Sequence, residues 1–291
     1  MKKLLLFLSV FLSISLMAQN TGNKIHFKKG QKLEIVTEAK KNSVMDLMGQ
    51  SMETKVNYTI TESFDVEDVN ETGATIEYKV KRILVDYSTM GREDSFDSEK
   101  EGDRNGQLGK AMEKGLKNKY TMKIDSYGKI ISVKADDDNP NAAKASPEEE
   151  AMNAMISSQL GITTGLPKEG DQSIFKILPD KNVSAGDTWN VDTDIEGLKK
   201  SSVYKVASIN DADIVLDYSE DVSVNSKQQM MGTEASVTGS EKSTGTITID
   251  KSTGLLKSKT ITKDGKTNIE AQGMTIPSTD KTTLTVTVRA N

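Results

Sequence analysis

Residues 55–61 read KVNYTIT, and this stretch carries the pattern that decides the fold. Val56, Tyr58 and Ile60 alternate with polar residues. A period of two places alternate side chains on opposite faces of an extended strand. The stretch therefore predicts a β-strand with one buried face and one face in water, which is typical of an antiparallel sheet.

Similar strand-like stretches recur on both sides of this one. They are separated by turn-forming runs of Asn, Asp, Ser and Gly at 70–73 (NETG), 125–128 (DSYG), 210–213 (NDAD) and 250–254 (DKSTG). Such runs between strands favour hairpins. The chain is therefore predicted to be mainly β, built from antiparallel meanders, with strands at 33–37, 74–85, 120–124, 129–133, 203–209, 214–224, 246–249, 255–260 and 283–288.

The two halves of the chain show a weak internal similarity. VEDVNETGATIEY at 66–78 matches VASINDADIVLDY at 206–218, and KGQKL at 29–33 matches AGDTW at 185–189. We interpret this as two related halves that form an extended sheet or half-barrel. Chance similarity between hairpin-rich segments is the alternative.

The first eighteen residues have the order of a secretory signal peptide. Lys2 and Lys3 precede the apolar run LLLFLSVFLSISL at 4–16, and Ala18 is the expected last residue before cleavage. The chain has no cysteine, so no N-terminal lipid anchor is expected. These features predict an exported protein, periplasmic or extracellular, with no transmembrane segment after cleavage.

The predicted organisation has four parts. Residues 1–18 are the signal peptide, 19–134 a first β meander, 135–165 a linker with an amphipathic helix, and 166–291 a second β meander.

The helix within 135–165 has clear start and stop signals. Ser146, Pro147 and Glu149 form a capping-box start, and Gly161 is a natural stop. A weaker helix is predicted at 108–118. The apolar face of the stronger helix consists of Met152, Met155, Ile156 and Leu160.

Composition argues against several functions. The formal net charge is −5, whereas a nucleic-acid partner requires a basic stripe. The chain has no cysteine, and His26 is its only histidine. A Cys–His or Ser–His triad therefore has no candidate base other than His26. The acidic run at 136–139 fails as an EF-hand, because Asn141 and Pro147 fall where Gly and Glu are required. We expect no catalytic residue, no metal and no cofactor.

Two further residue types have both a structural and a functional interpretation. Trp189, the only tryptophan, fits a core anchor at a strand start, or alternatively a ligand pocket. Several methionines lie near glycines, which suggests that they are at hairpin tips: Met45, Met48, Met52, Met230, Met231 and Met274. These side chains either fill gaps in the core or form the rim of a binding site.

A family resemblance rests on KGQKL at 29–33, on Leu–Pro pairs at 166–167 and 178–179, and mainly on PDKNVSAGDTW at 179–189. With these motifs the chain resembles an uncharacterised family of secreted Bacteroidota proteins, a domain of unknown function. The resemblance implies no catalytic residues. At the level of fold alone, meanders with a short amphipathic helix are similar to the half-barrel of periplasmic lipoprotein carriers.

These observations favour an exported, non-enzymatic envelope protein that binds a hydrophobic, lipid-like ligand or a lipidated partner. The expected ligand-binding residues are Trp189 and the helical lid residues Met152, Met155, Ile156 and Leu160. A structural or interaction module of the envelope without a ligand is the alternative, and a carbohydrate-active enzyme the second alternative. If the lid exists, Met155→Asp weakens ligand retention more than it lowers stability.

Overall fold

The computed structural model describes residues 23–136 and 165–290, apart from Met48, Glu196, 231–232 and Gln272. The predicted signal peptide and the predicted helix at 147–160 lie outside the described residues.

Twelve strands and two short helices form the described fold. The first half contains β1 (Lys32–Leu47), β2 (Gln50–Asn70), β3 (Gly73–Thr89), β4 (Arg92–Asp97), α1 (Glu101–Arg104), α2 (Gln107–Leu116), β5 (Lys119–Asp125) and β6 (Ile130–Ala135). The second half contains β7 (Thr188–Ile195), β8 (Leu198–Ile209), β9 (Asp213–Met230), β10 (Thr233–Asp250), β11 (Leu256–Ala271) and β12 (Met274–Ala290).

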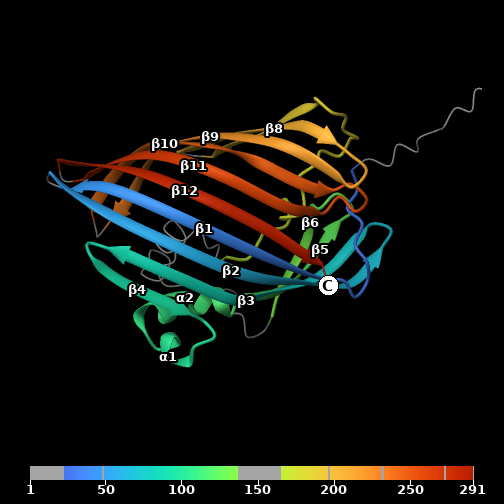
Figure 1. The fold of residues 1–291 in the computed structure, drawn as a ribbon, viewed down its shortest axis with the longest axis horizontal. Helices are drawn as coiled ribbons and strands as arrows, with labels where there is room; N and C mark the ends of the chain where they lie inside the picture. The colour runs from blue at the N-terminus through green and yellow to red at the C-terminus, as the bar shows by residue number, and fades with distance from the viewer. Residues whose placement is uncertain are drawn as a thin grey trace, which may run out of the picture.

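All twelve strands belong to one antiparallel sheet, in the order β6-β5-β3-β2-β1-β12-β11-β10-β9-β8-β7, with β4 also paired to β3. Nearly every strand pairs with its neighbour in sequence, and the two halves join where β1 pairs with β12. In Figure 1 the curved sheet shows β1 (blue) beside β12 (red) at this join. Because β6 and β7 are the two edges, the sheet stays open, and the predicted fold class is confirmed.

The halves share one hydrophobic core at the end of the sheet that carries the turns 70–73, 125–128, 210–213 and 250–254, here called the packed end. Leu33, Ile76, Leu216 and Ile247 contribute from both halves, with Phe175 from the irregular segment 165–187. Phe175 is 1% exposed and makes edge-to-face contacts with Phe27 and Phe64, at centroid distances of 5.3 and 5.2 Å. Segment 165–187 is thus part of the core.

The opposite, open end of the sheet carries the turns at Gly49, Gly91 and Gly273 and is much more polar. There the strands are longer than predicted: β1 continues to Leu47, ten residues beyond the predicted end at Thr37. The added residues include KKNSVMDL at 40–47 and have few buried apolar side chains. The apolar–polar alternation that predicts a strand is therefore lost there, although the backbone pairing continues. β4 was not predicted, because Phe96 is its only buried residue.

The predicted helix at 108–118 is confirmed as α2. Its Met112 is buried in a second cluster with Tyr58, Ile83 and Phe96, on the inner face of β1 to β4. Figure 1 shows α1 and α2 beneath β3 and β4.

Equivalent hydrogen bonds recur in the two halves. The Gly30 amide donates to the Val66 carbonyl at 2.8 Å, and the Gly186 amide donates to the Val206 carbonyl at 2.8 Å. A β-bulge follows each valine, between Val66 and Asp68 in one half and between Val206 and Ser208 in the other.

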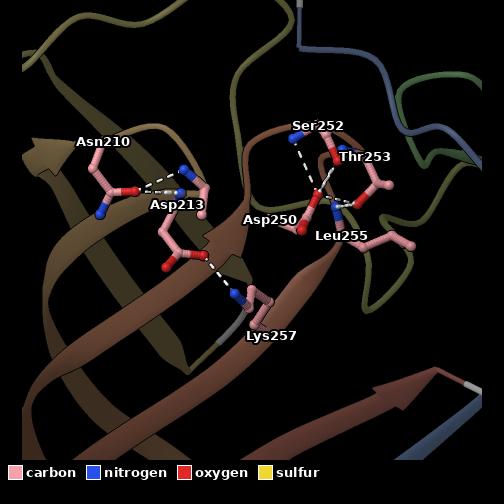
Figure 2. Close-up of polar contacts among 8 residues, drawn as sticks. Asn210, Asp213, Asp250, Ser252, Thr253, Leu255 and Lys257 are labelled. Atoms are coloured by element: carbon pink, nitrogen blue, oxygen red, sulfur yellow. Dashed lines mark hydrogen bonds and ion pairs between the residues drawn. The ribbon is translucent and has the colours of Figure 1, made fainter.

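The hairpin turns repeat as well. The Asn70 side-chain oxygen accepts the backbone amides of Thr72 and Gly73, as the Asn210 oxygen accepts those of Ala212 and Asp213. Figure 2 shows the second-half turns, where Asp250 likewise accepts the amides of Ser252 and Thr253. Repetition of side-chain and backbone contacts at matched positions supports an internal duplication over chance similarity.

Candidate functional site

Glu62 is a carboxyl group on the apolar inner face of the sheet. It follows Val56, Tyr58 and Ile60 along β2 with the same period of two, so strand geometry turns it inward with them. A β-bulge in β3 at this point pairs Thr61 with Arg82 and Glu62 with Val80. The Tyr78 hydroxyl donates a hydrogen bond of 2.7 Å to the Glu62 carboxylate.

Glu62 lines a cavity of about 430 Å³ between the inner face of β2, β3 and β5, the end of α2 and the segment 165–174. The lining is mainly apolar and aromatic. It consists of Thr37, Ile60, Glu62, Phe64, Tyr78, Val80, Ile83, Gly115, Asn118, Tyr120, Met122, Ile130, Gly165, Leu166, Pro167, Asp171, Gln172, Ser173 and Ile174.

Three aromatic rings form one wall of the cavity. Tyr78 stacks on Tyr120 with a centroid distance of 4.4 Å, and Phe64 meets Tyr78 edge-on at 5.1 Å. These rings belong to adjacent strands, where Phe64 pairs with Tyr78 and Tyr78 pairs with Tyr120. The sheet register therefore places the three rings side by side.

Burial controls the electrostatics of the cavity. Burial raises the pKa of the Glu62 carboxyl, and the hydrogen bond from Tyr78 opposes this only in part. Burial, together with the nearby Glu62, raises the pKa of Tyr78, so its hydroxyl keeps its proton and remains a donor at neutral pH. Among the described residues, Tyr78 is the only hydrogen-bond partner of Glu62, and no basic side chain forms an ion pair with it.

Two other polar groups line the cavity. Ser173 is 6% exposed, and its hydroxyl oxygen has no hydrogen-bond partner among the described residues. Asp171 is exposed, and its carboxylate accepts the Lys168 amide at 2.9 Å, which closes the local turn. A buried hydroxyl without a partner is uncommon in folded proteins, and the Ser173 oxygen lies close to Gly128, which is outside the lining.

The second half holds a related carboxylate with a different environment. Ser202 on β8 pairs with Glu220 on β9, and this pair matches Glu62 on β2 with Val80 on β3. The carboxylate therefore lies on the first strand of the pair in the first half and on the second strand in the second half. Glu220 accepts hydrogen bonds from Tyr218 at 2.6 Å and Ser202 at 2.8 Å, and Lys200 forms an ion pair with it at 2.6 Å.

These contacts give Glu220 the opposite pKa shift. Burial acts to raise the pKa of Glu220, but its hydrogen bonds with Lys200, Tyr218 and Ser202 outweigh this and lower it. Lys259 lies nearby with its ammonium 5.3 Å from the centroid of the Tyr218 ring. Glu220 is thus satisfied by the protein's own groups, whereas Glu62 has a single neutral donor.

The sequence-predicted site residues lie elsewhere or outside the described residues. Met152, Met155, Ile156 and Leu160 fall within 137–164, outside the described part of the chain. Trp189 is the second residue of β7, half-buried and stacked on Tyr204 at 5.3 Å with an interplanar angle of 3°. It packs against the shared core and is not in the lining of the Glu62 cavity, so its ligand-binding role stays a prediction.

The other candidates have simple surroundings. His26 is exposed, and its backbone amide donates to the Thr253 carbonyl at 2.8 Å. Asp136 forms an ion pair with Lys119 at 2.8 Å. No cluster of three metal-ligating side chains occurs in the part of the chain that the structure describes, and no helix in that part is long and apolar enough to cross a bilayer.

Glu62, Tyr78 and Ser173 were not predicted as site residues. A signal for Glu62 was present, because an acidic residue occupies an inward position in the alternation of Val56, Tyr58 and Ile60. Glu220 follows Ile214, Leu216 and Tyr218 in the same way. An acidic residue in phase with the apolar residues of a strand was therefore the informative pattern.

A model of a family of unknown function (DUF6263) matches residues 71–256, which include the 179–189 motif. The predicted resemblance to an uncharacterised family is confirmed. No curated protein matches the sequence.

Three solved structures show distant similarity. A structure of lipid–protein interactions in lipovitellin has 10% identity and a TM-score of 0.48, and it covers 89% of this chain. This chain spans only 25% of the lipovitellin chain. An outer membrane channel from Pseudomonas putida F1 has 7% identity and a TM-score of 0.25 and covers 92% of this chain and 98% of its own. The translocator domain of an autotransporter from Neisseria meningitidis has 8% identity and a TM-score of 0.20 and covers 90% of this chain and 89% of its own. TM-scores below 0.5 give no basis for transferring a ligand.

Proposed function

The chain belongs to the DUF6263 family of unknown function, and we propose that it is an exported, non-enzymatic envelope protein that binds a hydrophobic, lipid-like ligand in the Glu62 cavity. The ligand is a free lipid-like molecule or the acyl group of a lipidated partner.

The cavity itself carries this proposal. Its volume of about 430 Å³ lies within the range of small-molecule sites, and its lining is mostly apolar with a few convergent polar groups. A cavity of this size beside a closely packed core is therefore consistent with a binding site.

The position of the cavity supports the proposal further. One wall is the sheet, and the other is the segment 165–174, which is irregular and pairs with the chain at 128–130 through its residues 170–173. The Ser173 amide donates to the Gly128 carbonyl, the Ile130 amide to the Asp171 carbonyl and the Gly170 amide to the Ile130 carbonyl, each at 2.9 Å. The sheet side of the site is therefore built from paired strands, and the facing side is a segment held in place at 170–173.

The test is native mass spectrometry of the full chain exported to a bacterial envelope and purified without detergent. We expect a discrete additional mass that disappears after organic extraction. A protein mass with no addition, together with no binding of the neutral dye N-phenyl-1-naphthylamine, would overturn the proposal and favour a structural module of the envelope.

A pair of tryptophan variants on adjacent strands locates the site. Val80→Trp places a large ring in the cavity, whereas Lys123→Trp places the same ring on the exposed face of β5. The first variant should lose the additional mass and dye binding, and the second should keep both. Circular dichroism checks that both variants retain the sheet, and equal retention of ligand by the two would exclude this cavity as the site.

A further inference from the structure

We infer that the Glu62 cavity selects amphiphiles whose headgroup is an ammonium ion, held between the Glu62 carboxylate and the tyrosine wall. This inference rests on the proposed function and names the class of ligand for the same site.

The charge of the cavity lining gives the first argument. None of the described lining residues is lysine, arginine or histidine, and the two ionisable carboxyls are Glu62 and Asp171. An anionic headgroup, such as a carboxylate or phosphate, would be desolvated beside like charge with no cation to compensate. A cationic headgroup supplies the countercharge that Glu62 lacks.

The second half of the chain shows which positive groups would satisfy such a carboxylate. Ser202 on β8 matches Glu62 on β2, so Lys200, two residues before Ser202, matches Ile60. Lys259 pairs with Ile247 on β10, and the matching residue on β6 is Val133, which pairs with Met122.

Both lysines of the second half are therefore replaced by apolar residues in the first. Each half has a carboxylate that is bonded to the matched tyrosine, Glu220 to Tyr218 and Glu62 to Tyr78, although the two carboxylates lie on opposite strands of the pair. Among the described residues, the first half thus has a buried carboxyl group with no internal cation beside it, and an external ammonium would supply that missing charge from the cavity side.

The aromatic wall gives the third argument. Lys259 holds an ammonium 5.3 Å from the Tyr218 ring centroid, where Gly245 is the cross-strand partner of Tyr218. In the first half Tyr120 takes the place of Gly245 and stacks on Tyr78, so it is the Tyr120 ring, which lines the cavity, that an ammonium would meet. Ammonium ions are attracted to aromatic faces at this distance, and more strongly when water is excluded.

The experiment compares three twelve-carbon probes that differ only in headgroup: dodecylammonium, dodecanol and dodecanoate. Binding to the full chain is measured by isothermal titration calorimetry at about pH 7.5, below the aggregation concentration of each probe. We expect dodecylammonium to bind about tenfold or more tightly than dodecanol, since a charge-assisted hydrogen bond contributes at least that factor, and dodecanoate to bind most weakly.

Variants assign the preference to Glu62. Glu62→Gln should reduce dodecylammonium affinity to the level of dodecanol and leave dodecanol unchanged, whereas Glu67→Gln, on the exposed face of β2, should change neither. Val133→Lys introduces at the matched position the cation that the second half has, and it should also abolish the preference. This variant keeps the inference testable if Glu62→Gln fails to fold.

The outcomes separate the two proposals. Equal affinity for the three probes, or a preference for dodecanoate, overturns the ammonium inference while hydrophobic binding in the cavity stands. Failure of all three probes to bind overturns both.

Discussion

Phe175→Ala tests whether segment 165–187 is an integral part of the core that joins the two halves. Phe175 comes from an irregular segment, yet it is 1% exposed and contacts Phe27 and Phe64 edge-to-face. If the segment merely covered a sheet that was already stable, removing the ring would loosen it locally and leave the sheet intact.

The expected loss follows from the buried area. A buried phenylalanine removes roughly 150–250 Å² from water, and at about 25 cal/mol per Å² this amounts to roughly 4–6 kcal/mol. Alanine retains part of that area, while the lost ring contacts and the remaining cavity add to the cost. We therefore expect the free energy of unfolding to fall by about 4 kcal/mol, within the usual range for such substitutions.

Urea denaturation provides the assay. It is followed by far-ultraviolet circular dichroism and by the fluorescence of Trp189, the only tryptophan, which packs against the same core from the second half. Both signals should move to lower urea together. Ile174→Ala is the matched control, because Ile174 is 41% exposed and should cost less than about 1 kcal/mol. A loss below about 1 kcal/mol for Phe175→Ala, or a change in only one signal, would refute the shared core.

Three further predictions test the site, the repeat and the sheet. Burial raises the pKa of Glu62, so ionisation of this carboxyl weakens the native state as pH rises through its native pKa. In urea titrations between about pH 4 and about pH 8, Glu62→Gln should therefore gain stability relative to the natural chain as pH rises. A difference that stays constant with pH would contradict this. Asn70→Ala and Asn210→Ala each remove an acceptor of two backbone amides, so each should cost about 1–2 kcal/mol in thermal unfolding, and a difference above about 1 kcal/mol would argue against equivalent turns. Gly245→Ala would place a β-carbon 2.1 Å from a backbone oxygen of β11, so calorimetry should show a loss of at least about 1–3 kcal/mol in the free energy of unfolding. At Gly265 the nearest atom would be 3.5 Å from the new β-carbon, so the same change there should be nearly neutral.

Several features of the fold follow from short-range patterns. Alternation at Val56, Tyr58 and Ile60 predicted a half-buried strand, and the Asn and Asp turn residues predicted the hairpins now seen at 70–73 and 210–213. These signals are local, because side-chain direction has a period of two and turn residues bond to their own backbone. Hairpins between sequence neighbours then account for most of the sheet order.

The polar ends of the strands escaped prediction for the same reason. Residues 40–47 are held in β1 by pairing with both β2 and β12, and β12 is distant in sequence. Where neither face is strongly apolar, no alternation marks the strand, and partner strands alone determine its length.

The sequence by itself determined the strand-rich class, the main turns, helix α2 and the relation between the two halves, because each depends on side chains within a few residues of one another. Only the tertiary structure decided that β1 pairs with β12, that Phe175 enters the core, and that Glu62, Tyr120 and Ser173 line one cavity. Those contacts join segments separated by dozens to hundreds of residues. The pattern placed Glu62 on the inner face, but only the tertiary structure brought segment 165–174 opposite it to form a cavity without a countercharge among the described residues.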